Sequence, residues 1–314
     1  MIRRRCSRAG AVLLLPLLVL NAACRSSGGS GPRTGSKAGK EAVEAHAASP
    51  GGCSTVAPPP YRPTAEQAER DDILSLLAYA VVHKTWQATC SPAGDACPTS
   101  CRTSRGYNIG AVLAKLEQGK PQILCWGLNS VYRTRNWTQH GEVRLITNYL
   151  EGRGAFNKVD AFVYTTLEPC AMCAGMMTLT GVGTTIYGQA DPGYGEAIGR
   201  LVLSSTALPH GFCPYPRGVV SARAPGRISS ALAGRLEAGF AAYRQRCRDS
   251  ITDWLSTPEA EAIFAEAPSE LSRYAVQFPA NAGLLEAARR FLDGVPARDG
   301  GYLPIPYQSN CPPS

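Results

Sequence analysis

The chain has 314 residues, of which 44% are hydrophobic and 18% are charged. This composition supplies a packed core for one or two domains and excludes collagen, a coiled coil and a multi-span membrane protein. The formal net charge of +8 raises the question of a nucleic-acid or membrane partner. Twelve cysteines are too few for a small disulfide scaffold and many for a cytosolic enzyme.

The N-terminus has the pattern of an export signal. Four arginines precede the apolar run 11–20, which is too short to span a bilayer, and we predict a signal peptide over 1–23. Its removal leaves a formal charge of +4, because it carries four arginines and no acidic residue. The small residues before Cys24 resemble the lipobox of bacterial lipoproteins, which implies lipidation at Cys24; ordinary cleavage after Ala23 is the alternative. We therefore expect a periplasmic or cell-envelope protein, held at the membrane if Cys24 carries a lipid.

The mature chain begins with a stretch rich in Gly, Ser and Pro, 24–63, which predicts a flexible tether. Beyond it, hydrophobic periodicity predicts helices at 64–81, 138–150, 171–180, 230–248, 250–265 and 284–292. Strands are predicted at 108–114, 122–128, 160–166, 184–188 and 219–223, the first two as an antiparallel pair separated by the polar stretch 115–121. Alternation of helix and strand indicates an α/β domain over 64–228, followed by a helical C-terminal extension over 229–314.

Two short motifs point to metal chemistry. His140 and Glu142 form H-x-E at the start of one predicted helix, and 169–173 forms P-C-x-x-C at the start of the next. One imidazole and two thiolates, from His140, Cys170 and Cys173, give zinc three protein ligands and leave the fourth tetrahedral position for water. The free N–H groups of a helix N-terminus favour thiolates there. Glu142 lies two residues beyond the histidine and is the predicted general acid and base, not a ligand.

Each motif alone has a simpler explanation. A C-x-x-C pair in an exported protein also fits a disulfide or a redox pair, and an isolated H-x-E arises by chance. A structural zinc would need a fourth protein ligand. The two motifs together, with a strand leading into the second helix, match the zinc deaminase signature, so we predict a catalytic Zn²⁺.

Residues 108–190 resemble the deaminase domain of the bacterial tRNA adenosine deaminase and guanine deaminase families. The most similar stretch is 165–175, Thr-Thr-Leu-Glu-Pro-Cys-Ala-Met-Cys-Ala-Gly, and Gly-Ala-Val at 110–112 resembles a strand of the family. The resemblance implies a cytidine-deaminase-like fold of three layers, α/β/α, with a five-stranded mixed sheet. It also implies that the amide of Asn129 contacts the base, with a turn residue as the alternative, and that the backbone at Gly141 faces the substrate.

The sequence departs from that family just before the histidine. The family usually has Asp-Pro-Thr-Ala-His-Ala-Glu, whereas this chain has Asn-Trp-Thr-Gln-His-Gly-Glu at 136–142. The ligand and the acid/base residue are kept while the rim of the pocket changes, so the identity of the substrate stays open. Trp137 is either a stacking surface for a base or a core residue. Asn136 with Thr138 also matches a glycosylation sequon, which we take as accidental beside a metal site.

The remaining cysteines fit an oxidising compartment. Eight are left when the signal, Cys24 and the two ligands are set aside, and they allow up to four disulfides of unassigned pairing. These eight are Cys53, Cys90, Cys97, Cys101, Cys125, Cys213, Cys247 and Cys311. A buried free thiol is the alternative at Cys125, because that cysteine lies within a predicted strand.

The last basic cluster decides between two kinds of substrate. Tyr243, Arg244, Arg246 and Arg248 are similar to the aromatic and basic end of the last helix in tRNA adenosine deaminases, which would bind phosphates and stack a base. The alternative is a helix C-terminus with arginines that suit its dipole. Arginines at the pocket mouth would favour a polynucleotide substrate.

The predicted function is hydrolytic deamination, in which an amino-bearing ring carbon of a base becomes a carbonyl and ammonia is released. A free nucleobase or nucleoside is the first choice of substrate, because an exported protein does not meet its own cell's tRNA. The alternatives are a nucleic-acid deaminase, either tRNA-directed or a secreted effector, and a non-catalytic envelope protein stabilised by zinc. The resemblance further implies a homo-oligomer.

Overall fold

The computed structural model describes residues 59–92, 94–151, 153, 161–215 and 218–296. Internal contacts divide the chain into Met1–Pro50 and Gly51–Ser314, and every described residue lies in the second unit. The predicted signal peptide, the lipidation site Cys24 and most of the predicted tether lie outside the described residues.

A five-stranded mixed sheet forms the centre of the second unit, with the order β2-β1-β3-β4-β5. The strands are β1 (Gly110–Glu117), β2 (Lys120–Leu128), β3 (Ala161–Leu167), β4 (Thr184–Gln189) and β5 (Val220–Arg223). β1 is antiparallel to both β2 and β3, whereas β3, β4 and β5 run parallel. The predicted mixed sheet of five strands is therefore confirmed.

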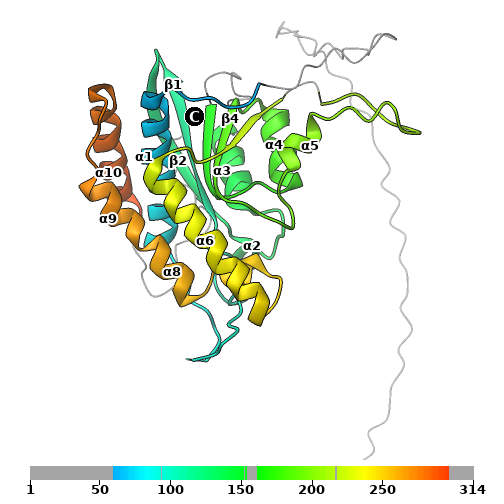
Figure 1. Cartoon of the computed structure of the whole chain (residues 1–314), viewed down its shortest axis with the longest axis vertical. Coiled ribbons are helices and arrows are strands. Elements are labelled where there is room, and N and C mark those ends of the chain that lie inside the picture. The colour runs from blue at the N-terminus through cyan, green and yellow to red at the C-terminus, as the bar shows by residue number, and fades with distance from the viewer. Residues whose placement is uncertain (1–58, 93, 152, 154–160, 216–217, 297–314) are drawn as a thin grey trace, which may run out of the picture. The chain divides into compact units, whose positions relative to one another are not determined.

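Helices cover both faces of the sheet (Figure 1). One face packs on α3 (Gly141–Leu150), α4 (Ala171–Thr180) and α5 (Ala197–Leu201), and the other on α1 (Ala65–Lys84) and α6 (Arg227–Arg246). A hydrophobic core lies on each face of the sheet, and successive side chains of β1 point to opposite faces, as in any strand. Val112 belongs to the core on the α1 side, and Leu113 to the core on the α3 side. The arrangement is the predicted three-layer α/β/α fold.

The C-terminal helices join the core on the α1 side. They are α7 (Ile251–Trp254), α8 (Pro258–Phe264), α9 (Glu266–Arg273) and α10 (Ala282–Gly294), with a short α2 (Val131–Thr134) earlier in the chain. The ring of Phe264 lies 5.0 Å from that of Tyr79 of α1, centroid to centroid. The helical tail is thus continuous with the core, and the boundary at 228/229 stays a prediction.

The predicted single helix over 250–265 is wrong. The chain breaks after α7, because Thr257 accepts a hydrogen bond from the N–H of Ala260 and caps a new helix whose first residue is Pro258. Proline fits the first helical position, where its missing N–H has no partner to lose. Apolar spacing continues across this break, which is why periodicity alone did not reveal it.

The polar stretch predicted to separate the first two strands is itself mostly strand. β1 and β2 pair as far as Glu117 with Lys120, and only Gln118 and Gly119 form the turn. Both turn residues have left-handed φ values, 53° and 78°, as a two-residue type I′ hairpin turn requires.

Close backbone contact fixes the start of α3 against this hairpin. A Cβ atom on Gly127 would lie 2.3 Å from the carbonyl oxygen of Gly141, and one on Gly141 would lie 2.9 Å from the carbonyl oxygen of Gly127. Gly110 of β1 lies at the same contact, with its Cα 3.2 Å from the Gly141 Cβ position. Glycine is required here because nothing larger fits between the helix and the sheet.

A carboxylate of α1 caps the start of α6. The N-cap position of α6 is Gly226, which has no side chain to bond the free N–H groups. Asp72 caps the helix instead, because it accepts hydrogen bonds from the N–H groups of Ile228 and Ser229 at 3.3 and 2.7 Å. It also accepts a hydrogen bond from the Tyr274 hydroxyl.

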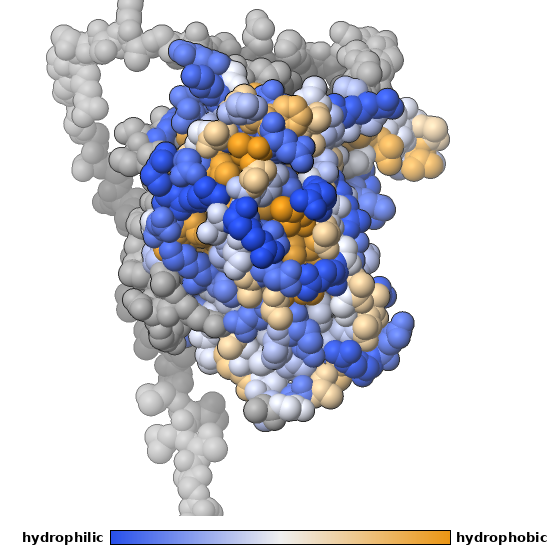
Figure 2. All heavy atoms as spheres, turned by 60° about the vertical axis from the view of Figure 1, so that its left-hand side comes forward, coloured by the Kyte–Doolittle hydropathy of each residue, from blue (hydrophilic) through white to orange (hydrophobic). Residues whose placement is uncertain are grey.

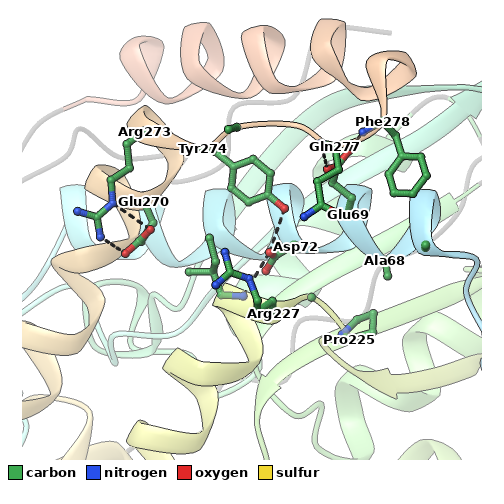
Figure 3. A pocket seen from close by; sticks show the side chains of 14 residues that line it. Ala68, Glu69, Asp72, Pro225, Arg227, Glu270, Arg273, Tyr274, Gln277 and Phe278 are labelled. Atoms are coloured by element: carbon green, nitrogen blue, oxygen red, sulfur yellow. Dashed lines mark hydrogen bonds and ion pairs between the residues drawn. The ribbon is translucent and has the colours of Figure 1, made fainter.

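Glu69, one turn earlier in α1, holds the segment that leads to α10. It accepts hydrogen bonds from the N–H of Phe278 at 3.2 Å and from the amide of Asn281 at 2.7 Å. Figure 3 shows Glu69 and Asp72 on α1. Both line a cavity of about 520 Å³, together with residues of α6, of α9 and of the segment after α9. Both carboxylates are thus occupied by hydrogen bonds to the start of α6 and to the segment before α10, so we assign them a structural role.

Within the part of the chain that the structure describes, no helix combines the length and the apolar character needed to cross a membrane. Figure 2 views the molecule from the side of α9 and α10, where hydrophilic residues predominate and apolar ones form small separate patches. These helices therefore present polar faces outward and bury apolar ones against α1.

We expect Gly127→Ala to lower the free energy of unfolding by about 1–3 kcal/mol, because the new methyl group overpacks the contact between α3 and the sheet. Gly283→Ala is the matched control, since a Cβ there meets no atom within 4 Å. It lies in α10 and should be neutral or slightly stabilising. Chemical denaturation of both variants measures the difference, and equal stabilities would show that α3 does not depend on this contact.

Candidate metal centre and active site

The three predicted zinc ligands meet where α3 and α4 begin. His140 is the N-cap residue of α3 and Cys170 that of α4, while Cys173 lies in the first turn of α4. The Nδ1 atom of His140 lies 3.6 Å from each sulfur, and the two sulfurs are 3.7 Å apart. Among the described residues, this is the group in which three possible metal ligands converge.

This triangle has the dimensions of a tetrahedral zinc site. Bonds of about 2.3 Å to sulfur and about 2.0–2.1 Å to nitrogen place two thiolates about 3.8 Å apart and each about 3.6 Å from the nitrogen. No fourth metal-binding side chain of the described residues joins the cluster. A site with three protein ligands is typical of catalytic zinc, since structural sites are closed by a fourth.

The two thiols ionise unequally, and this favours a bound cation. Hydrogen bonds from the Cys173 thiol and the His140 ring lower the pKa of Cys170 to about 4. The pKa of Cys173 is raised by its hydrogen bond with Cys170 and by burial beside Glu142. A Zn²⁺ ion bound between the two sulfurs would stabilise both as thiolates.

Every other described cysteine is in a disulfide. Cys90 pairs with Cys101 and Cys97 with Cys247, and Cys125 and Cys213 are also disulfide-bonded. Only Cys170 and Cys173 of the described cysteines are free thiols. The alternative of a free thiol at Cys125 is therefore wrong. The structure does not describe Cys53 or Cys311.

Glu142 lies beside the metal centre and is buried. Its Oε1 accepts a hydrogen bond from the Thr165 hydroxyl at 3.2 Å, and its Oε2 lies 3.6 Å from the Cys173 sulfur. Burial raises the pKa of the Glu142 carboxyl, because a charge is poorly solvated there. A carboxyl held next to the ligands with a raised pKa suits the predicted exchange of protons.

A cavity of about 710 Å³ opens at this centre. Its lining includes His140, Cys170 and Glu142, and side chains from 191–194 and 249–252 form further parts of the wall. The described lining includes four carboxyl side chains and no lysine or arginine. The four acidic residues are Glu142, Glu168, Asp191 and Asp249.

Asn129 lines the cavity in a fixed orientation. Its Oδ1 accepts hydrogen bonds from the N–H groups of Tyr107 and Val131, at 3.2 and 3.3 Å. Its Nδ2 is buried and has no partner among the described residues. The amide therefore keeps an unused donor, and the predicted turn role does not account for it.

Gly141, the other predicted substrate contact, lies elsewhere. It is buried in the contact between α3 and the hairpin and is not among the residues that line the cavity. The structure shows a packing role for Gly141, and its contact with a substrate stays a prediction.

Aromatic side chains form the rim of the cavity. Trp137 is 69% exposed, so the alternative of a core residue is wrong. Its ring contacts Tyr132 edge to face at 6.2 Å, and Tyr132 in turn contacts Tyr107 at 5.2 Å, centroid to centroid. Tyr194, which is 73% exposed, also lines the cavity.

The basic end of α6 does not reach the cavity. Tyr243 is buried and its hydroxyl donates to the carbonyl of Pro98 at 2.9 Å. Arg244, Arg246 and Arg248 are absent from the described lining and pair with Asp249, Glu259 and Asp253 respectively, at 2.9, 3.8 and 3.9 Å. The arginines thus neutralise nearby carboxylates at the end of the helix.

Sequence reasoning missed several parts of this site. They are Thr165, which contacts Glu142, and the cavity-lining residues Phe240 and 249–252; the last two lie far from both motifs in sequence, and no local pattern marks them. Thr165 alone had a signal, because it belongs to the stretch that leads into Cys170. The other parts are brought to the cavity by the helical tail.

Comparisons with known proteins agree with this geometry. Residues 86–189 match the family model for the cytidine and deoxycytidylate deaminase zinc-binding region. The tRNA-specific adenosine deaminase 2 of Xenopus laevis is 33% identical over 94 residues, which are 28% of this chain and 54% of that protein. The tRNA-specific adenosine deaminase of Rickettsia bellii is 31% identical over 93 residues, 30% of this chain and 63% of that protein. Residues 86–189 thus carry a deaminase-type zinc-binding region.

A solved guanine deaminase from Bacillus subtilis is 27% identical, covers 31% of this chain and 62% of its own, and superposes with a TM-score of 0.25. This chain spans about half the length of the curated relative from Xenopus laevis. Substrates and partners of such relatives are therefore matters for proposal.

We expect Cys173→Ala to abolish tight zinc binding, because two remaining ligands cannot hold the ion. Glu142→Gln is the matched control, because Glu142 lies beside Cys173 but is not a ligand, and this variant should keep its zinc. Metal analysis after dialysis measures both. Full zinc occupancy in the Cys173→Ala protein would refute the ligand set.

Proposed function

We propose that this protein is a zinc-dependent hydrolytic deaminase that acts on an amino-bearing nucleobase or its nucleoside and releases ammonia. The triangle of His140, Cys170 and Cys173, with Glu142 beside it and no fourth protein ligand, carries this proposal. A zinc ion bound there supplies a Lewis acid that activates water.

Glu142 would move the proton that the reaction requires. Hydrolysis adds water across an amidine carbon and expels ammonia, so a group must accept a proton from water and return it to the leaving nitrogen. The raised pKa of Glu142 suits both proton transfers, because such a carboxylate accepts a proton more readily than an exposed one does. The Thr165 hydroxyl keeps Oε1 in place.

The charge of the cavity favours an uncharged substrate. Asp191 and Asp249 line it, and no lysine or arginine of the described residues does so. Asp249 is paired with Arg244, so a phosphate group would meet the carboxyl groups of Glu168 and Asp191 without a lysine or arginine on the described wall. A neutral base can instead accept a hydrogen bond from Asn129 and stack on Trp137. We therefore favour a free base or nucleoside over a nucleotide.

A nucleic-acid deaminase is the second candidate, because the curated relatives given above are named as tRNA adenosine deaminases. The exposed rings of Trp137 and Tyr194 could stack bases next to the reacting one. The arginines at and just after the end of α6 argue against a nucleic-acid substrate, because each is paired with a carboxylate and none lines the cavity.

Export to an oxidising compartment is part of the proposal. Three structural features support it: the disulfides at Cys90–Cys101 and Cys97–Cys247, and the bonded state of Cys125. Lipidation at Cys24 and the homo-oligomer stay predictions.

We expect ammonia release from at least one member of a panel of adenine, guanine and cytosine compounds, offered as bases, nucleosides and short oligonucleotides. Glu142→Gln should reduce turnover by about 10²–10⁴-fold and keep its zinc, because it removes a general acid and base. Activity confined to oligonucleotides would favour the second candidate. No release by zinc-loaded wild-type protein would refute both and favour a structural zinc.

We expect Trp137→Ala to raise KM about tenfold and to change kcat less, because a stacked base loses about 1–3 kcal/mol of binding without its aromatic surface. Phe212→Ala is the matched control, since Phe212 is equally exposed but does not line the cavity. Steady-state kinetics on the substrate found in the panel measures both. Equal KM values would show that the ring does not bind substrate.

A further inference from the structure

We propose that the disulfide-linked segment 90–107, here named the stapled segment, is a positioning element of the substrate cavity. It turns the Asn129 amide so that a hydrogen-bond donor, and no acceptor, meets the substrate. The proposal rests on the proposed function for the identity of the substrate, whereas the contacts that carry it are in the structure itself. It accounts for a part of the chain that the zinc motifs leave unexplained.

Three successive residues at the end of the stapled segment surround Asn129. Arg105 donates from Nη1 to the backbone carbonyl of Asn129, and the N–H of Tyr107 donates to its Oδ1 at 3.2 Å. Gly106 lies between them against the side chain, where a Cβ would come 2.4 Å from Oδ1. Oδ1 of Asn129 therefore occupies space that a side chain at residue 106 would need, and its two N–H donors orient the amide.

The contacts of residues 105–107 with Asn129, here named the cradle, determine which polar atom of Asn129 is available to a ligand. The backbone N–H of Asn129 bonds to the carbonyl of Ile109, and Oδ1 is occupied by two N–H donors. The buried Nδ2 is the polar atom that stays without a partner among the described residues. A buried donor without a partner is unfavourable, so a substrate that presents an acceptor there, a carbonyl oxygen or a ring nitrogen, gains affinity.

Arg105 is suited to hold such a cradle rigidly. Its guanidinium is fully buried, and burial lowers its pKa to about 9. It makes its bonds to main-chain carbonyls, those of Asn129 and Tyr107, and the backbone oxygen of Arg105 accepts from the N–H of Arg133. The stapled segment is thereby bonded on both sides of the turn that carries Asn129.

Disulfides fix the other end of the stapled segment. Cys90 and Cys101 close the loop on itself, and Cys97 ties it to Cys247, the residue that ends α6. Next to this link, the N–H of Ser100 donates to Asp253 Oδ1 at 2.7 Å. The position of the cradle thus depends on the end of α6.

The same disulfide also lies close in sequence to a second part of the cavity wall. The segment 249–252, which lines the cavity, begins two residues after Cys247. One disulfide therefore holds both the Asn129 side and the 249–252 side of the cavity. The zinc ligands are on α3 and α4 and have no bond to the stapled segment among the described contacts. Substrate binding and zinc binding are accordingly separable.

The test is a double variant, Cys97→Ser with Cys247→Ser, made in the full chain. We expect KM to rise about tenfold or more, because displacement of positioning groups by about 1 Å is costly, while kcat changes less. Zinc content should equal that of the wild type. An unchanged KM, or loss of zinc in parallel with loss of activity, would overturn the proposal.

A second variant covers the case in which the double variant does not fold. Gly106→Ala pushes directly on Oδ1 and leaves both disulfides in place. It should raise KM with zinc retained, and Gly283→Ala, which has open space around its Cβ, should change neither. Equal KM values for Gly106→Ala and Gly283→Ala would count against the cradle.

A readout without substrate separates this proposal from the proposed function. The side-chain NH₂ signals of Asn129 in a ¹⁵N correlation spectrum are identified by their loss in Asn129→Asp. We expect them to shift in both test variants and to stay in place in Gly283→Ala. Shifted signals in a protein whose wild type releases no ammonia would refute the proposed function alone. Unshifted signals would refute the cradle, whatever the activity.

Discussion

The contact between the first turn of α3 and the β1–β2 hairpin determines where the chemistry can occur. Helix and sheet touch there backbone to backbone, because Gly127 and Gly141 leave no side chain between them. His140 is the N-cap residue of this helix, so the contact fixes the position of its backbone relative to the sheet. The parallel strands β3 and β4 place α4 beside α3 and bring Cys170 and Cys173 within 3.6 Å of that imidazole.

Charge divides the active site into two parts. The metal centre gathers two thiols and a buried carboxyl, an arrangement that a divalent cation makes favourable. The wall of the cavity adds further carboxylates and, in its described part, no basic side chain. Arginines do occur nearby at the end of α6, but each is paired with a carboxylate. These features support the proposal of an uncharged substrate that is held by hydrogen bonds and stacking.

The parts of the chain outside the zinc motifs build the walls around this centre. Tyr107 of the stapled segment and residues 249–252 after α6 both line the cavity, and Cys97–Cys247 connects the two segments. The C-terminal helices complete the core behind α1, where Phe264 and Trp254 are fully buried. Disulfides and a shared core thus give the loops of the cavity the fixed geometry that positioning requires.

The sequence by itself determined the five strands, most of the longer helices and the chemistry of the metal centre, but not the helices α2, α5 and α9. Strand and helix periods are local, and the two motifs place their ligands at helix starts, so His140, Glu142, Cys170 and Cys173 could be named before any fold was known. Only the tertiary structure decided the surroundings of these residues. It places Trp137 at the exposed rim, packs Gly141 on the sheet and pairs Arg244 and Arg246 of α6 with carboxylates. Local patterns also failed at Pro258, where a cap interrupts continuous apolar spacing. These outcomes depend on contacts between residues far apart in sequence, which no local pattern records.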